Sequence, residues 1–198
     1  VLLMNDLTGI NARASLAPGV QSGSTAVQID VSEGPIFSGS LWGDNYGNRY
    51  TGTWRGNGLI SLNDPLRYGD QLSMMVTGAE GLVQGRVAYL APLLPNGLKA
   101  NLSYTGMYYD LIEDLSALDM DGWSHTLDAG FSYPFLRSRK LNLAGTLGYE
   151  MKLLRDRSSD IDLYDKLLNS GTLGLHGDEY DTFLGGGYTT FNVGATLG

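Results

Sequence analysis

The sequence predicts an all-β protein: part of an antiparallel transmembrane β-barrel, preceded by a short α+β segment. Apolar and polar residues alternate with a period of two in nine runs after residue 36, as expected for strands with one apolar and one polar face. Several runs are much longer than the usual five or six residues, which favours a tilted barrel wall. The chain also contains 28 Gly and 12 Tyr, and only 17% of its residues are charged.

Composition excludes several classes of protein. The chain of 198 residues carries a net charge of −8, which disfavours binding of nucleic acid through a basic surface. It has no Cys, so disulfides and thiol chemistry are impossible. No apolar run is long enough for a transmembrane helix, whereas a barrel strand needs only about 9–11 residues of alternating polarity. The sequence starts at Val1, and we expect it to be a fragment of a longer protein.

Residues 1–34 differ from the rest and predict the end of a small α+β module. Residues 1–7 suit the last turns of a helix, followed by a short strand over 12–16. Residues 25–33 alternate as a second strand, so a hairpin is expected. Gly34-Pro35 is a natural joint, which divides the chain into residues 1–34 and 35–198.

The second unit is predicted to hold nine antiparallel strands. Turns containing Pro follow the second, fourth and sixth, whereas long polar connections follow the fifth (110–121) and seventh (155–166). One helical turn is expected within residues 111–120. Short turns at one end and long loops at the other are typical of an outer-membrane barrel, and aromatic residues gather near both strand ends. The predicted strands are 37–44, 50–63, 70–78, 82–90, 97–110, 122–135, 141–154, 167–178 and 188–197.

The alternative is a soluble β-sandwich, which would need its polar face outward and several shorter strands. In the second predicted strand, Trp54 lies on the apolar side and Arg55 on the polar side. The turn after this strand is expected at the end of the barrel that joins residues 1–34. Its predicted motif consists of Asn63, Asp64, Pro65, Leu66, Gly69 and Asp70.

Polar residues on the inward face would line a hydrated lumen, in which charges of both signs avoid tight binding of any one substrate. The other reading is that they pair across neighbouring strands and only stabilise the wall. The predicted lumen residues are Arg55, Gln84, Arg86, Lys99, Asp128, Glu150, Lys152 and His176.

The sequence gives little support for catalysis. His125 and Asp128 fall on opposite faces of one strand, and His176 shares a face with Asp178 but has no identifiable nucleophile. Two His and no Cys argue against a zinc site, and no Gly-rich phosphate loop opens a helix. We predict no catalytic residue, metal site or cofactor.

Several short motifs resemble one family in their order and spacing. These are Asp44-Asn45-Tyr46-Gly47, Tyr50-Thr51-Gly52, Leu62-Asn63-Asp64-Pro65-Leu66, Gly69-Asp70-Gln71-Leu72, and Tyr133 to Arg139. Together they are similar to the TpsB transporters of two-partner secretion, the haemolysin-activator proteins ShlB, FhaC and HecB. The resemblance covers essentially the whole chain.

The resemblance implies two periplasmic POTRA modules followed by a sixteen-strand barrel of the BamA-like superfamily. Residues 1–34 would then end the second POTRA in the periplasm, and residues 35–198 would form about nine barrel strands in the outer membrane of a Gram-negative bacterium. It implies no enzyme activity.

The partner implied is an unfolded exoprotein of the haemolysin or adhesin type, secreted by the type Vb route. Outer-membrane lipid is the other partner, and a monomer is favoured. Residues 26–33 form a candidate edge for capturing an extended chain by strand addition. The alternatives are a general diffusion porin or structural barrel, and an outer-membrane enzyme.

Overall fold

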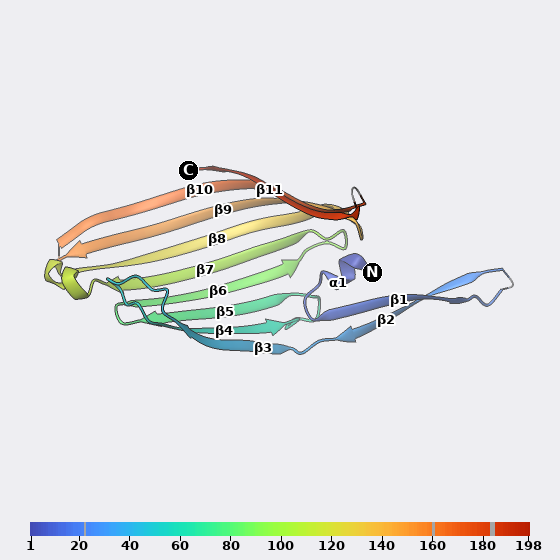
Figure 1. Cartoon of the computed structure of the whole chain (residues 1–198), viewed down its shortest axis with the longest axis horizontal. Helices are drawn as coiled ribbons and strands as arrows, with labels where there is room; N and C mark the ends of the chain where they lie inside the picture. Colours follow the sequence, from blue (N-terminus) through green and yellow to red (C-terminus); the bar gives the residue numbers. More distant parts are fainter. Residues whose placement is uncertain (22, 160, 183–184) are drawn as a thin grey trace.

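The computed structural model describes residues 1–21, 23–159, 161–182 and 185–198. Two sheets make up this part of the chain: the two-stranded β1–β2 sheet, and a nine-stranded sheet in which β3 to β11 follow one another in chain order. All neighbouring strands are antiparallel. Figure 1 shows the nine strands as one long wall, with β1–β2 projecting from one end. The predicted barrel-type sheet of nine strands is confirmed.

The N-terminal segment is a short helix followed by a hairpin, as predicted. The helix α1 spans Leu2–Asn5, and the hairpin strands are β1 (Ile10–Pro18) and β2 (Thr25–Glu33). The Asn5 side chain fixes the helix to β1, because its Nδ2 donates to the Ala12 carbonyl at 2.9 Å and its Oδ1 accepts from the Ala12 N–H at 2.6 Å. No helix in the described ranges is both long and apolar enough to cross a membrane.

The wall strands lengthen from β3 to β10, and β11 is shorter. A 3-10 helix, Glu113–Leu118, lies in the connection before β8 and confirms the helical turn expected there. The strands are β3 (Phe37–Asp44), β4 (Arg55–Asn63), β5 (Gln71–Ala79), β6 (Leu82–Pro92), β7 (Lys99–Asp110), β8 (Met120–Arg137), β9 (Leu141–Ser158), β10 (Ile161–Asp181) and β11 (Gly187–Leu197).

The prediction that the second wall strand begins at residue 50 is wrong. Residues 45–54 form a loop, and β4 begins only at Arg55. The Gly47 N–H bonds the Thr53 carbonyl at 3.0 Å, and the Gly81 N–H bonds the Thr51 carbonyl at 2.9 Å, so these backbone groups are satisfied outside the main ladder. Trp54 therefore lies just before the strand and is exposed.

The polar connection predicted over residues 155–166 is also wrong. Strand β9 continues to Ser158 and β10 begins at Ile161, so the hairpin extends through most of the predicted loop. Arg155 pairs with Asp165 at 2.7 Å across these two strands. Opposite charges facing each other stabilise neighbouring strands, so a charged composition is compatible with strand here.

The wall has one apolar and one polar face, which the register traces from strand to strand because directly opposed residues share a face. Leu72 opposes Tyr89, and Tyr89 opposes Leu102. One complete apolar row runs Phe37, Leu62, Leu72, Tyr89, Leu102, Ala129, Tyr149, Gly171 and Leu197. The adjacent row on the other face runs Ser38, Ser61, Ser73, Ala88, Ser103, Asp128, Glu150 and Ser170.

The apolar face is open in the described part of the chain. Leu102 is 52% exposed and Leu173 is 64% exposed, and the single described apolar residue that is buried is Ala12 in the hairpin. A soluble domain of this size would bury much of its surface around a core. The described residues provide no second sheet over this face, as a sandwich would require, so lipid is the medium that suits it.

The height of the apolar face matches a membrane. Along β10 it runs from Leu167 to Gly177, interrupted by Asn169, which accepts a hydrogen bond from the Tyr149 hydroxyl at 2.7 Å. Ten steps of about 3.3 Å, tilted by about 40°, give a height of about 25 Å. The apolar band of an outer-membrane barrel has this height.

Arginine substitutions at two neighbouring positions of β10 test which face of the wall meets lipid. We expect Leu173→Arg to lower the free energy of unfolding of the full-length protein in lipid vesicles by about 2–4 kcal/mol, because the charge enters the hydrocarbon region. Thr172→Arg, one residue away on the polar face, is the matched control and should cost much less. Equal losses from the two variants, measured by urea titration, would contradict the assignment of the faces.

Candidate functional site

The candidate site is the polar face of the wall, together with the place where the N-terminal segment meets it. The register puts all eight predicted lumen residues on this face. For example, Thr77 opposes Gln84, and Thr77 opposes Asn57, which shares a face with Arg55. That this face encloses a lumen stays a prediction. The eight residues are Arg55, Gln84, Arg86, Lys99, Asp128, Glu150, Lys152 and His176.

Three neighbouring strands share a hydrogen-bond chain in the middle of the polar face. Arg86 Nη2 on β6 donates to Ser103 Oγ at 3.0 Å, and Ser103 Oγ on β7 donates to Asp128 Oδ2 on β8 at 2.8 Å. Ser103 is buried between its two partners. These residues therefore pair within the wall, as the alternative reading of the sequence expected.

Arg55 also has partners within the wall. Its Nε donates to Asp44 Oδ1 at 2.8 Å, and Asn57 Nδ2 donates to the other oxygen of Asp44 at 2.9 Å. Thr77 then donates to Asn57 Oδ1 at 2.9 Å, which extends the chain to β5. Sequence reasoning did not single out Asp44 as a site residue, although it faces Arg55 across the hairpin.

Glu150 and Lys152 differ from these arginines. Neither side chain makes a hydrogen bond or ion pair with the described residues. They lie two residues apart on β9, so their side chains are on the same face of the strand. Their charges are opposite. This part of the polar face therefore presents charges of both signs.

The predicted turn motif between β4 and β5 is held by two carboxylates. Asp70 is fully buried, and it accepts hydrogen bonds from the Leu66 N–H at 3.1 Å and the Tyr89 hydroxyl at 2.8 Å. Asp64 accepts the Gly69 N–H at 2.6 Å. A buried carboxylate is stable only when its oxygens are bonded in this way, so the motif closes the turn.

The same turn meets the joint between the two units. Asn63 donates from its backbone N–H to the Ile36 carbonyl at 2.7 Å and from Nδ2 to the Pro35 carbonyl at 3.0 Å. Gly69 has a φ of 87°, and a Cβ there would lie 2.8 Å from Leu7 Cβ. Gly69 is therefore required both by its backbone conformation and by the close approach of Leu7. Pro65 and Leu66 remain exposed.

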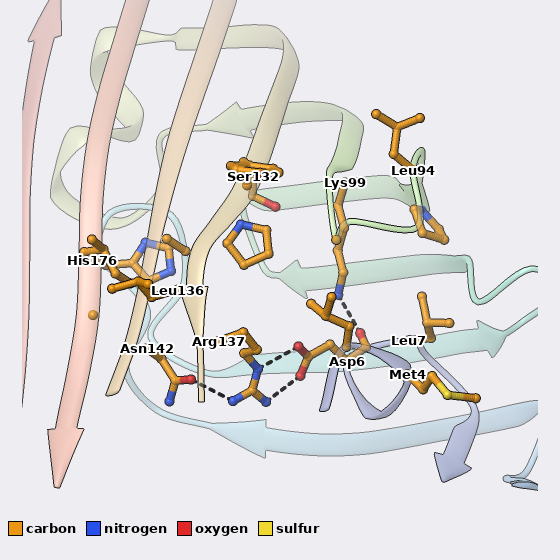
Figure 2. A pocket seen from close by; sticks show the side chains of 18 of the residues that line it. Met4, Asp6, Leu7, Leu94, Lys99, Ser132, Leu136, Arg137, Asn142 and His176 are labelled. Carbon is orange, nitrogen blue, oxygen red and sulfur yellow. Dashed lines mark hydrogen bonds and ion pairs between the residues drawn. The ribbon is translucent and has the colours of Figure 1, made fainter. Parts of the chain in front are cut away.

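Charged side chains of β7 and β8 also bond Asp6, the residue that follows the N-terminal helix. Arg137 at the end of β8 forms a bidentate pair with Asp6, with Nη2 to Oδ1 at 2.6 Å and Nε to Oδ2 at 2.7 Å (Figure 2). Lys99 Nζ donates to the Asp6 carbonyl at 2.5 Å. The hydrogen bonds from Arg137 hold the pKa of Asp6 below its usual range. No sequence pattern predicted this contact, because the partners lie 131 residues apart.

A cavity of about 600 Å³ lies between the helix and the polar face of the wall. Figure 2 shows its lining, to which the N-terminal segment contributes Met4 and Leu7 and the wall contributes Leu136 and His176. The cationic side chains of Lys99 and Arg137 also line the cavity. The cavity is thus mainly apolar, with cationic groups next to Asp6.

The two histidines do not form a catalytic arrangement with the described residues. His125 lies on the apolar face, where it bonds the Tyr104 hydroxyl and packs against Trp123 with ring centroids 4.7 Å apart. His176 lies on the polar face, and its neighbour Asp178 accepts from Asn142 Nδ2 at 2.9 Å. Within the described residues, no group of His, Asp and Glu side chains is arranged to hold a metal ion.

Comparisons with known proteins identify one family. The profile of the haemolysin secretion/activation proteins ShlB/FhaC/HecB matches residues 23–198. The heme/hemopexin transporter protein HuxB of Haemophilus influenzae is 29% identical over 184 residues, covering 89% of this chain and 32% of HuxB. The outer membrane transporter CdiB of Escherichia coli is 27% identical over 197 residues, covering 92% of this chain and 32% of CdiB.

Solved structures show the same fold. CdiB from Escherichia coli matches 98% of this chain and 37% of its own, with a TM-score of 0.80 and 23% identity. BamA from Haemophilus ducreyi matches 94% of this chain and 38% of its own, with a TM-score of 0.52 and 14% identity. The chain spans about a third of the length of the relatives it matches.

Loss of the Asp70 charge tests the turn. In Asp70→Asn, an amide NH2 replaces one carboxylate oxygen, so either Leu66 or Tyr89 loses its acceptor. We expect the free energy of unfolding to fall by about 1–3 kcal/mol. Glu80→Gln, an exposed carboxylate in the turn at the other end of the wall, is the control and should have little effect. Similar values for both variants would show that the buried carboxylate has no special role.

The Asp6 contact predicts a defined pH dependence. Because the pKa of Asp6 is lowered from 3.8, the stabilisation is complete above that value and is lost as the pH falls through the lowered pKa. The difference in unfolding free energy between wild type and Asp6→Asn should therefore be constant, at up to about 1 kcal/mol, from about pH 5 to 8 and shrink below about pH 4. A difference that grows on acidification would contradict the ion pair.

Proposed function

The chain belongs to the haemolysin secretion/activation family ShlB/FhaC/HecB, and on that basis we propose that it is part of a transporter that secretes a partner exoprotein by two-partner, type Vb secretion. The observation that carries the proposal is the match of the family profile to residues 23–198. The wall itself is of the outer-membrane type, with an apolar face of membrane height and a polar opposite face. The cargo would be an unfolded polypeptide of the haemolysin or adhesin type that moves along the polar face.

Closure of the wall is part of this proposal. In the described chain, β3 pairs only with β4 and β11 only with β10, so each leaves one edge of backbone groups without a strand partner. Unpaired backbone is costly in lipid, so the full-length protein requires further strands to close the barrel. We propose sixteen strands in total, with the protein acting as a monomer.

The N-terminal helix and hairpin are proposed to be the end of a periplasmic POTRA module, with residues 1–34 forming that part and residues 35–198 the barrel. β2 pairs with β1 along one edge, and its other edge has no strand partner among the described residues. An extended cargo segment could add to this edge through backbone hydrogen bonds, which demand little of its sequence.

A general diffusion porin or structural barrel is the second candidate. The docked N-terminal segment argues against it, because a pore for small solutes needs no module held at its periplasmic end. An outer-membrane enzyme has less support, since the two histidines lie on opposite faces of the wall. We favour transport of a polypeptide over both.

Secretion by the native host tests the function. We expect deletion of the full-length gene to remove at least one large exoprotein from the culture medium and retain it in the periplasm. The wild-type gene should restore secretion, whereas a variant with Pro at Ile29 and Val31 of β2 should restore it poorly, because Pro removes backbone donors. Pro at Val20, in the exposed hairpin turn, is the control. An unchanged exoprotein profile in the deletion strain would refute the proposal.

A further inference from the structure

The contact between Asp6 and Arg137 has the features of a reversible closure at the periplasmic end of the wall. We infer that this ion pair is a latch: it holds the N-terminal helix across the end of the polar face, and it opens when a polypeptide passes. The opening step rests on the proposed secretion function, whereas the latch itself is a statement about how residues 1–34 are held.

The N-terminal segment is fixed to the wall at two separate places. One is the covalent joint, where Asn63 of the wall bonds the Pro35 and Ile36 carbonyls. Thr8 N–H bonds the Gly69 carbonyl at 3.3 Å beside it. These contacts are mostly backbone bonds close to the connecting chain, so they make this place a natural pivot.

The second place is the latch, on the other side of the helix. Here the Asp6 carboxylate meets Arg137 and the Asp6 carbonyl meets Lys99, while Leu3 lies against Gly97. The strands β1 and β2 project away from the wall (Figure 1). Loss of the latch would therefore leave residues 1–34 attached to the described wall mainly at the pivot.

The latch is built to be reversible. The side chains of Asp6 and Arg137 remain 27% and 31% exposed, so water and other ions reach the pair, and such pairs are weak. Behind them lies the cavity of about 600 Å³ between the helix and the wall, so this side of the contact is not closely packed. Separation here opens this cavity at the end of the polar face.

Distance measurements test the latch without secretion. The described sequence has no Cys, so spin labels at Val20→Cys, in the exposed hairpin turn, and Lys140→Cys, in the β8–β9 turn, report the position of the module in the full-length protein made free of other cysteines. In lipid vesicles we expect one narrow distance distribution for wild type. Asp6→Asn and Arg137→Gln should at least double its width.

Arg139→Gln is the matched control, because Arg139 lies two residues beyond Arg137, in the β8–β9 turn, and makes no ion pair with the described residues. It should leave the distribution narrow. Arg137→Lys keeps the charge but not the bidentate geometry, so an intermediate width is expected. Unchanged distributions in both Asp6→Asn and Arg137→Gln would overturn the latch, as would equal broadening by Arg139→Gln. Heat-modifiable migration on gels verifies that each variant has a folded barrel.

Reversible cross-linking tests the opening step. In the double variant Asp6→Cys, Arg137→Cys, the two thiols are joined in cells by a thiol reagent with a cleavable spacer. We expect exoprotein secretion to fall at least tenfold when they are joined and to recover after cleavage. Undiminished secretion by the joined protein would overturn the required opening. Absence of secretion by the unlinked wild type would instead refute the proposed function, and the spin-label distances would still decide the latch.

Discussion

The continuous register of the wall is the constraint on which the rest of the structure depends. A strand in lipid has to bond its backbone groups to its neighbours, because no water is available to replace them. Each of β3 to β11 is paired with the next along the chain, and opposed residues therefore share a face throughout. The apolar row through Leu102 and the polar row through Ser103 lie on opposite sides for this reason. The stabilising apolar contacts of such a wall come from lipid, which explains why the described chain has almost no buried apolar core.

The two ends of the wall are held in different ways. At the end nearest residues 1–34, a short turn is closed by the buried carboxylate of Asp70. At the other end, Arg49 in the β3–β4 loop pairs with Asp114 in the connection before β8 at 2.6 Å, and Arg157 on β9 pairs with Asp121 opposite it on β8 at 2.7 Å. Exposed pairs of this kind contribute little individually. The first end is thus a firm base against which another module can dock, and the second is stabilised mainly by reversible polar contacts.

The strand number and the two faces could be predicted because they follow from a local pattern, the period of two, repeated nine times. The limits of strands were less predictable. Residues 50–54 alternate like a strand, but Gly52 adopts a φ of 112° and the loop bonds to other connections instead. Arg155 and Asp165 suggested a solvated loop, because the sequence does not show that they oppose each other.

The sequence could give the members of the polar face but not their partners. All eight predicted residues share that face because parity alone decides it. Whether Arg86 is free or bonded depends on Ser103 and Asp128, which come from two other strands and are fixed by register. The Asp6–Arg137 pair depends on docking between units, for which no periodic signal exists.

The distribution of paired and unpaired charges suits the passage of a polypeptide. Arg55 and Arg86 are bonded within the wall, so they stabilise it and are poorly placed to hold a passing carboxylate. Glu150 and Lys152 lie side by side on one face with opposite charges and no bonded partner among the described residues. A surface with charges of both signs stays hydrated. Arg137 and Lys99, at the end of the wall, both bond to Asp6 while the helix is docked.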